Sequence, residues 1–286
     1  MDRLILHQTI SSFSKIPLNH EQCYRLLTRF LSLTTNVKDL GQILCYAIMA
    51  EHKLALEVLE IISSKISKNL MKCVVNYVFR SDLNTPLHIS VINISLVQEL
   101  IKHGANVWKE NSKGLLPLNI CLKLEQTEHI CLFLLEHMFN TAETVIEWNE
   151  LVRKHALLSS AIEQNYLSVV KILLQNTTCD IALLLQMLEY SFQTMSHNSV
   201  VDALVQSILL QNNFNSRNLT SPVDLALEYN ELHVMLTFIK NGKHPCFLNL
   251  FFLFLSLSLS LSLSFFSLLL SKFNVKKLLK SNDCSN

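Results

Sequence analysis

Asn84-Thr85-Pro86-Leu87-His88 is the stretch of sequence that decides the fold. Thr85 can cap a helix through its hydroxyl, and Pro86 then occupies the first helical position, where a missing backbone N–H does no harm. Leu87 follows at a position that would face a neighbouring helix. The stretch therefore predicts the start of a short helix with one apolar face.

A second helix is predicted from Leu96 to His103, because Val97, Leu100 and Ile101 share one face at helical spacing. Gly104 is expected to end this helix, since Gly adopts the left-handed conformation of a helix end without strain. A single pair of short helices cannot bury its own apolar face. Neighbouring units of the same kind are therefore required.

The order of these features resembles one unit of the ankyrin-repeat family, read from its first helix to its hairpin finger. The resemblance implies a hydrogen bond between His88 and the Thr85 hydroxyl. It also implies that residues Gly104 to Gly114 form the finger between two units, and that Leu116-Pro117-Leu118-Asn119 starts the next unit. The implied fold is an all-α, ankyrin-type helix-turn-helix solenoid with short hairpin fingers.

Weaker copies of the unit recur along the chain. The apolar positions Leu100 and Phe133 are 33 residues apart, and Leu173 and Phe238 are 65 apart, which is close to two repeats. The intervals from Leu59 to Leu100 and from Phe133 to Leu173 are 41 and 40 residues. Each of these two longer intervals is expected to hold one repeat and a short insertion.

The predicted ankyrin-repeat domain covers residues 40–243 and holds five to six degenerate units, after an N-terminal helical cap over residues 1–39. Gln42 to Ile62 is interpreted as an early unit, and Asp180 to Gln211 as a late unit without a recognisable signature. The last complete unit opens at Ser221, with Ser in place of Thr. The predicted structural signature comprises Thr85, Pro86, Leu87, His88, Gly104, Gly114, Pro117, Ser221, Pro222 and Gly242.

Composition favours a helical interaction module over several other classes of protein. Hydrophobic residues make up 50% of the chain, and only 4 Gly and 5 Pro interrupt 286 residues. The net charge of +1 gives no electrostatic footprint for nucleic acid. The eight Cys residues are scattered without a Cys-x-x-Cys pair, so single buried thiols are expected in place of disulfides.

The sequence offers no set of residues for catalysis. Its four Gly residues are isolated, so no glycine-rich loop can hold a phosphate or dinucleotide. His129 and Cys131 are two residues apart, and side chains at that spacing point apart on a helix, which argues against a pair of metal ligands. We therefore expect no enzyme activity, no cofactor and no metal.

The resemblance implies that an unidentified protein partner binds at the fingers and the first helices. Trp108 is the favoured contact, because a Trp in a rigid loop is a typical binding hot spot. In the alternative interpretation, the ring folds back onto the neighbouring finger. The predicted partner-binding residues are Trp108, Lys109, Glu110, Asn111, Lys113 and Arg217, with Trp148 in the insertion as a weaker candidate.

Residues 244–286 form a separate low-complexity tail rich in Phe, Leu and Ser. From Cys246 to Leu270 the chain has 25 consecutive uncharged residues, enough to cross a bilayer as a helix (246–270). The strict Leu-Ser alternation from Leu255 to Ser264 would spread Ser around every side of that helix, and the basic residues after it favour the opposite orientation. Translation of a pyrimidine-rich intron would give the same composition, and a genuine soluble segment is a third interpretation; all three stay open.

Met1 to Gln8 lacks the layout of a signal peptide, so a cytoplasmic location is expected, with the nucleus possible and a membrane if the tail is a genuine span. Two alternative functions remain: a C-terminally membrane-anchored ankyrin adaptor and a truncated substrate receptor of a ubiquitin ligase. The elongin-binding box of such receptors has a Leu four residues before a Cys, and none of the eight Cys residues has one.

Overall fold

The computed structural model describes residues 20–50, 52–79, 82–142, 144–211 and 222–241. Within these residues the protein is all-α, with fifteen helices and one isolated bridge between Phe79 and Asn84. The all-α class predicted from the sequence is confirmed. The chain divides after Asn213 into two compact units, which are described separately.

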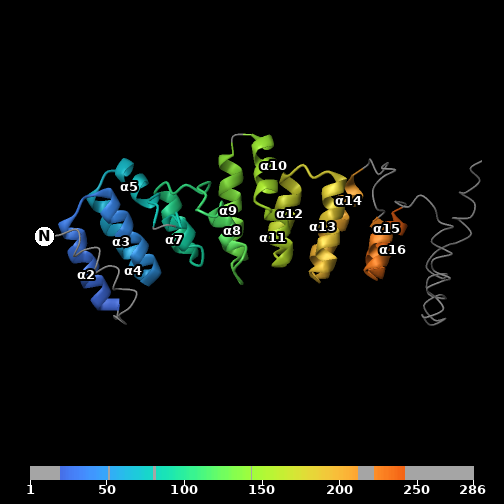
Figure 1. Cartoon of the computed structure of the whole chain (residues 1–286), viewed down its shortest axis with the longest axis horizontal. Helices are drawn as coiled ribbons and strands as arrows, with labels where there is room; N and C mark the ends of the chain where they lie inside the picture. Colours follow the sequence, from blue (N-terminus) through green and yellow to red (C-terminus); the bar gives the residue numbers. More distant parts are fainter. Residues whose placement is uncertain (1–19, 51, 80–81, 143, 212–221, 242–286) are drawn as a thin grey trace, which may run out of the picture. The chain divides into compact units, whose positions relative to one another are not determined.

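The first unit contains thirteen of the described helices (Figure 1). They are α2 (His20–Leu33), α3 (Val37–Ala50), α4 (His52–Lys65), α5 (Lys68–Val75), α6 (Pro86–Ile89), α7 (Ile94–Lys102), α8 (Pro117–Cys121), α9 (Glu128–Thr141), α10 (Val145–Lys154), α11 (Leu157–Glu163), α12 (Leu167–Asn176), α13 (Ile181–Gln193) and α14 (Asn198–Leu210). In the second unit α15 (Pro222–Glu228) packs against α16 (Leu232–Lys240).

Helices of the first unit pack as successive pairs. The pairs are α3 with α4, α6 with α7, α8 with α9, α11 with α12, and α13 with α14. The second helices form a continuous row, in which α4 contacts α7, α7 contacts α9, α9 contacts α12, and α12 contacts α14. In the other row α3 contacts α6, α6 contacts α8, and α11 contacts α13. The unit that carried no recognisable signature, Asp180 to Gln211, is therefore a helix pair like the others.

The two intervals that exceed one repeat each contain an extra helix. α5 follows the α3–α4 pair, and α10 follows the α8–α9 pair. Both extra helices contact the first helix of a pair, since α5 packs on α3 and α10 packs on α11. The predicted insertions are thus short helices, and the finger between α7 and α8 lies between them along the chain.

The N-terminal helix α2 packs against α3 and α4 and buries Leu27 and Leu31. α3 begins at Val37, so the predicted boundary between a cap (1–39) and a repeat domain (40–243) falls inside this helix. The early unit also extends beyond Gln42–Ile62, because its two helices together span Val37 to Lys65. The apolar patterns located these helices but left their ends undefined.

The turns inside several helix pairs share one geometry. Asn165, Met195 and Asn230 have positive φ angles of 58°, 52° and 59°, each just after the first helix of a pair. The next residue then bonds back five positions, as from Tyr166 N to Ala161 O at 3.0 Å. This is the hydrogen bond of a left-handed helix end. Asn stands at two of these sites and Met at the third, so no single residue type marks the turn, and the sequence did not reveal this repeat.

Several predicted residues and segments lie outside the described part of the chain: Arg217, Ser221, Gly242 and the tail 244–286, which includes the predicted span 246–270. Pro222 is described and starts α15, as its place in the signature predicts. Across the described residues, every helix is too short or too polar to cross a membrane.

Candidate functional site

The finger between α7 and α8 begins at Gly104, whose φ of 90° confirms the predicted left-handed helix end. Asn76, at the end of α5, holds the start of the finger through both atoms of its amide. Its Nδ2 donates to the Gly104 carbonyl at 2.8 Å, and its Oδ1 accepts from Asn106 N at 2.7 Å. The extra helix α5 therefore fixes one side of the finger.

The tip of the finger is a hydrogen-bonded turn built around Asn111. Its Oδ1 accepts from the backbone N–H groups of Lys113 and Leu115, at 2.9 and 3.1 Å. Its Nδ2 donates to Asn84 Oδ1 at 3.0 Å, while Gly114 adopts the expected positive φ of 68°. The Asn111 side chain thus stabilises the finger itself, and we remove it from the predicted partner contacts.

Glu110 fixes the other side of the finger. Its Oε1 accepts a hydrogen bond from Lys154 Nζ at 2.6 Å and lies 3.5 Å from His155 Nε2, at the end of α10. The hydrogen bond from Lys154 lowers the pKa of the Glu110 carboxyl. The extra helix α10 therefore supports the finger opposite to α5, and Glu110 acts within the molecule.

Thr85 and His88 form the hydrogen bond that the resemblance implies. Thr85 Oγ1 lies 2.8 Å from His88 Nδ1, and the Thr85 backbone N–H donates to the same nitrogen at 3.1 Å. His88 Nε2 lies 3.1 Å from the Leu115 carbonyl, beyond the finger. Because Nδ1 accepts from a backbone N–H, the proton of the neutral ring resides on Nε2. The sequence predicted that the Thr85 hydroxyl caps the helix. In the structure this hydroxyl contacts the His88 imidazole.

Asn119 repeats both functions of His88 one unit later. Its Oδ1 accepts from Leu116 N at 3.1 Å, and its Nδ2 donates to the His155 carbonyl at 2.8 Å. In these two units the side chain two positions after the Pro, His88 or Asn119, joins the start of its own helix to a backbone carbonyl just before the first helix of the following unit. The sequence placed Asn119 in this unit without predicting that hydrogen bond. The sequence signal for this bond was available, because Asn119 follows Pro117 by two residues, as His88 follows Pro86.

Two histidines beside the finger are held in their neutral form. Burial lowers the pKa of His88, and its hydrogen bond with the Leu115 carbonyl opposes this only in part. Burial also lowers the pKa of His155, although the charge of Glu110 acts in the opposite direction. Both rings therefore serve as neutral hydrogen-bonding groups near pH 7.

Trp108 is half-buried and lies between two clefts. The first, which we name the α5–finger cleft, has a volume of about 430 Å³ and is lined by the end of α5, the finger and the end of α9. The second, the α10–finger cleft, measures about 300 Å³ and lies between Trp108, the end of α9 and α10. Trp108 and Thr141 line both clefts. The Trp108 side chain thus separates the α5–finger cleft from the α10–finger cleft.

Trp148 was a candidate surface contact, and the structure corrects that interpretation. Its side chain is only 1% exposed and packs edge-to-face on Phe139, with ring centroids 5.5 Å apart. The buried indole N–H has no acceptor among the described residues. Trp148 therefore packs α10 against Phe139 of α9. The sequence could not distinguish this position from an exposed one, because α10 lies in an insertion without a repeat pattern.

The remaining predicted contacts are exposed. Lys109 lines the α5–finger cleft, whereas Lys113 lies in the turn at the tip. Trp108 and Lys109 therefore remain together at one cleft. Lys113 is outside its lining.

Cys121 and Cys131 were expected to be isolated thiols, but the structure brings them together. Cys131 Sγ donates to Cys121 Sγ at 3.0 Å, and both side chains are fully buried. This donated hydrogen bond, followed by burial, raises the pKa of the Cys131 thiol. Within the described residues, no group of three His, Cys, Asp or Glu side chains could hold a metal ion.

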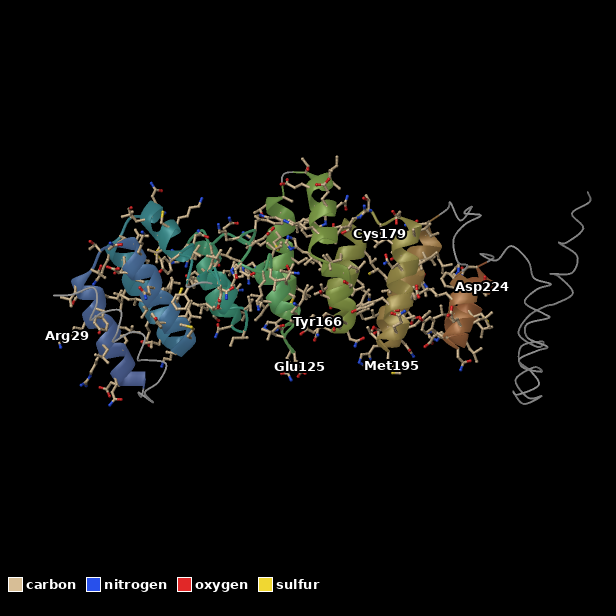
Figure 2. The ribbon with its side chains drawn as sticks, viewed as in Figure 1. Arg29, Glu125, Tyr166, Cys179, Met195 and Asp224 are labelled. Atoms are coloured by element: carbon tan, nitrogen blue, oxygen red, sulfur yellow. The ribbon has the colours of Figure 1, made fainter. Side chains whose placement is uncertain are left out.

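Figure 2 shows that the turns inside the helix pairs share one edge of the first unit. Glu125, Tyr166 and Met195 mark this edge, whereas Cys179, in the connection from α12 to α13, lies on the opposite edge. Tyr166 joins two neighbouring turns, since its hydroxyl accepts from Thr127 N at 3.1 Å and donates to the Leu124 carbonyl. The turns are therefore linked to one another through hydrogen bonds.

A comparison of the chain with protein-family models finds no matching family, and a search of curated proteins finds no similar protein.

Proposed function

We propose that the protein is a non-enzymatic protein–protein interaction module of the ankyrin-repeat type, which binds a partner through the Trp108 finger. One observation carries the proposal: a finger held on both sides places a half-buried Trp108 between two clefts. The stacked helix pairs and the Thr85–His88 hydrogen bond support the ankyrin relation.

The contacts of the finger favour binding because they fix its shape before a partner arrives. Asn76 holds its start, Asn111 closes its tip, and Glu110 joins it to Lys154. A loop that must be ordered on binding reduces the affinity, and a preformed loop avoids most of that loss. The finger is therefore suited to recognise a partner with little rearrangement.

Trp108 is the side chain on which we expect the binding free energy to concentrate. Trp is among the residues enriched at hot spots, particularly where less important contacts around it exclude water. The Trp108 side chain is half-buried and lines both clefts. Such a ring offers apolar area at a small loss of conformational entropy.

The chemistry of the surrounding side chains supports recognition over catalysis. His88 and His155 are used in structural hydrogen bonds, and the raised pKa of Cys131 keeps its thiol protonated. Cys73 and Cys179 are free thiols, which suits the reducing cytosol or nucleus that the proposal includes.

The proposal is tested by proximity labelling in cells with the full chain and its Trp108→Ala variant. We expect the variant to lose specific labelled proteins. The affinity for a recovered partner should fall by more than about 1 kcal/mol, while the melting temperature stays nearly constant. Met195→Ala is the matched control, because Met195 is 90% exposed and lies on the edge formed by the turns. Equal losses of stability and affinity would instead identify Trp108 as a packing residue.

A further inference from the structure

We infer that the α5–finger cleft binds an acidic peptide segment of the partner, with a carboxylate near Lys72, Lys109 and His137 and an apolar group on Trp108. This inference deepens the proposed function and rests on it. It assigns the chemistry of the partner, which the finger alone does not define.

The charged side chains that line the cleft are all basic. Lys72 from α5 and Lys109 from the finger line it, together with His137 from α9, and none of its described lining residues is Asp or Glu. Within the described residues, neither lysine forms an ion pair. Two unpaired cations at one cleft favour an anionic partner, and such rim charges select partners by complementarity.

The carboxylates near the cleft along the chain, including Glu136 beside His137, do not line it. Glu110 follows Lys109 directly but binds Lys154 on the opposite side of the finger. Glu99, on α7, pairs with Lys102 at 3.1 Å. Glu147 lines the α10–finger cleft. The positive charge of Lys72 and Lys109 is therefore left to a ligand.

The negative end of the α9 dipole opposes an anion, since α9 ends at Thr141 beside the cleft. Two carbonyls near that end already have donors. Thr141 Oγ1 donates to the His137 carbonyl at 2.8 Å, and Ala142 N donates to the Met138 carbonyl at 3.0 Å. The carbonyls at the helix end carry only partial charges, whereas the lysines carry full charges. The lysines therefore determine which charge the cleft attracts.

Size and the neighbouring cleft support a peptide with a defined direction. The volume of about 430 Å³ falls within the range of roughly 300–1,000 Å³ that is typical of ligand sites. Across the Trp108 ring, the α10–finger cleft contains Glu147 as its charged group. An acidic residue is therefore favoured on the α5 side and disfavoured on the α10 side, which sets the direction of the peptide over Trp108.

The test is a selection of random twelve-residue peptides, displayed on phage, against the immobilised full chain. Selected sequences are synthesised with a fluorescent label, and their Kd is measured by anisotropy. We expect Asp or Glu beside an aromatic or aliphatic residue. Lys72→Glu combined with Lys109→Glu should weaken binding at least about tenfold, and replacement of the peptide's acidic residues by amides should do the same.

Lys113→Glu is the matched control, because Lys113 is exposed on the same finger but outside the cleft. It should change the Kd by less than about twofold. Lys72→Gln with Lys109→Gln, checked by circular dichroism, removes both charges without reversing them. A similar loss of affinity with an unchanged melting curve would support the inference.

Two outcomes contradict the inference and are distinguishable from each other. If the selected peptides are neutral or basic, and only Trp108→Ala reduces their binding, the acidic specificity is wrong and the proposed function stands. If no peptide binds, or if binding ignores Trp108→Ala, the proposed function fails and the inference fails with it.

Discussion

The region from α6 to α9 and the pair α13–α14 occupy equivalent places in the stack but are stabilised differently. In the first region, α6 and α8 have only 4 and 5 residues, and the buried side chains of His88 and Asn119 join successive units. In the second, both helices have 13 residues and bury an apolar face that includes Leu188, Leu204 and Ile208.

This difference shows how one kind of unit tolerates loss of its signature. A helix of one turn buries little apolar surface and is not stable alone, so hydrogen bonds with fixed geometry must position it. Apolar packing depends on volume and pattern more than on particular residues. The short helices therefore depend on a hydrogen-bonding side chain two positions after the Pro, His88 in α6 and Asn119 in α8, whereas the long pair needs only a hydrophobic face.

The largest effect is expected in the apolar pair. Leu204→Ala should lower the free energy of unfolding by about 2–5 kcal/mol, because it leaves a cavity in a fully buried position. Chemical denaturation of the full chain measures the loss. Gln206→Ala, on the exposed side of the same helix, should change stability by less than about 0.5 kcal/mol. A loss at Leu204 no larger than that control would contradict apolar packing as the basis of this pair.

In the polar region, His88→Leu should cost about 2–3 kcal/mol, because it keeps an apolar side chain but leaves buried Thr85 N–H and Leu115 carbonyl groups without their partner. His88→Asn is the matched control, since Asn119 makes the equivalent two contacts in the next unit. Denaturation should show a smaller loss for His88→Asn. Equal losses would mean that volume, not hydrogen bonding, determines stability here.

The two regions should also differ in how strongly their stability depends on pH. Burial lowers the folded-state pKa of His88 and His155, so the unfolded chain binds more protons in the acidic range. Their contribution is fully present above the unfolded value of about 6.5 and is lost as pH falls from there through the folded pKa. Denaturation midpoints at about pH 5 and 7.5 should differ less in His88→Asn than in the wild type. A Leu204→Ala variant should keep the wild-type difference.

The smallest effect is expected in the turn of the apolar pair. Met195 has a φ of 52° and is 90% exposed, so Met195→Gly relieves a left-handed conformation without loss of burial. Stability should rise by up to about 1 kcal/mol, because the relief slightly exceeds the added entropy of the unfolded chain. Gly104→Ala should have the opposite sign, because a residue with a Cβ is strained at the φ of 90° that Gly104 adopts. Melting temperatures of the two variants test this contrast.

Much of the local structure was predictable from the sequence. The apolar spacing predicted the helices, the Pro residues predicted where α6, α8 and α15 begin, and Gly104 and Gly114 predicted two left-handed positions. The Thr85–His88 hydrogen bond, which the family resemblance implied, joins residues three apart. These features depend on interactions between near neighbours, so the order of residues contains the necessary information.

The candidate site was only partly predictable. The sequence placed a Trp in the finger, but it could not show that Asn111 binds Asn84, that Glu110 binds Lys154, or that Trp148 is buried against Phe139. It also did not reveal that the extra helices α5 and α10 support the two sides of that finger. Each of these contacts joins residues from different helices or loops, which come together only when the helices pack.

By itself, the sequence determined an all-α chain of repeated helix pairs, because helix periodicity, proline and glycine act over a few residues. Only the tertiary structure decided which finger residues remain available to a partner. Lys109 and Glu110 are adjacent in sequence, yet one lines an open cleft and the other binds Lys154. Their difference arises from packing, since the helix that each side chain meets is set by the stacking of distant units.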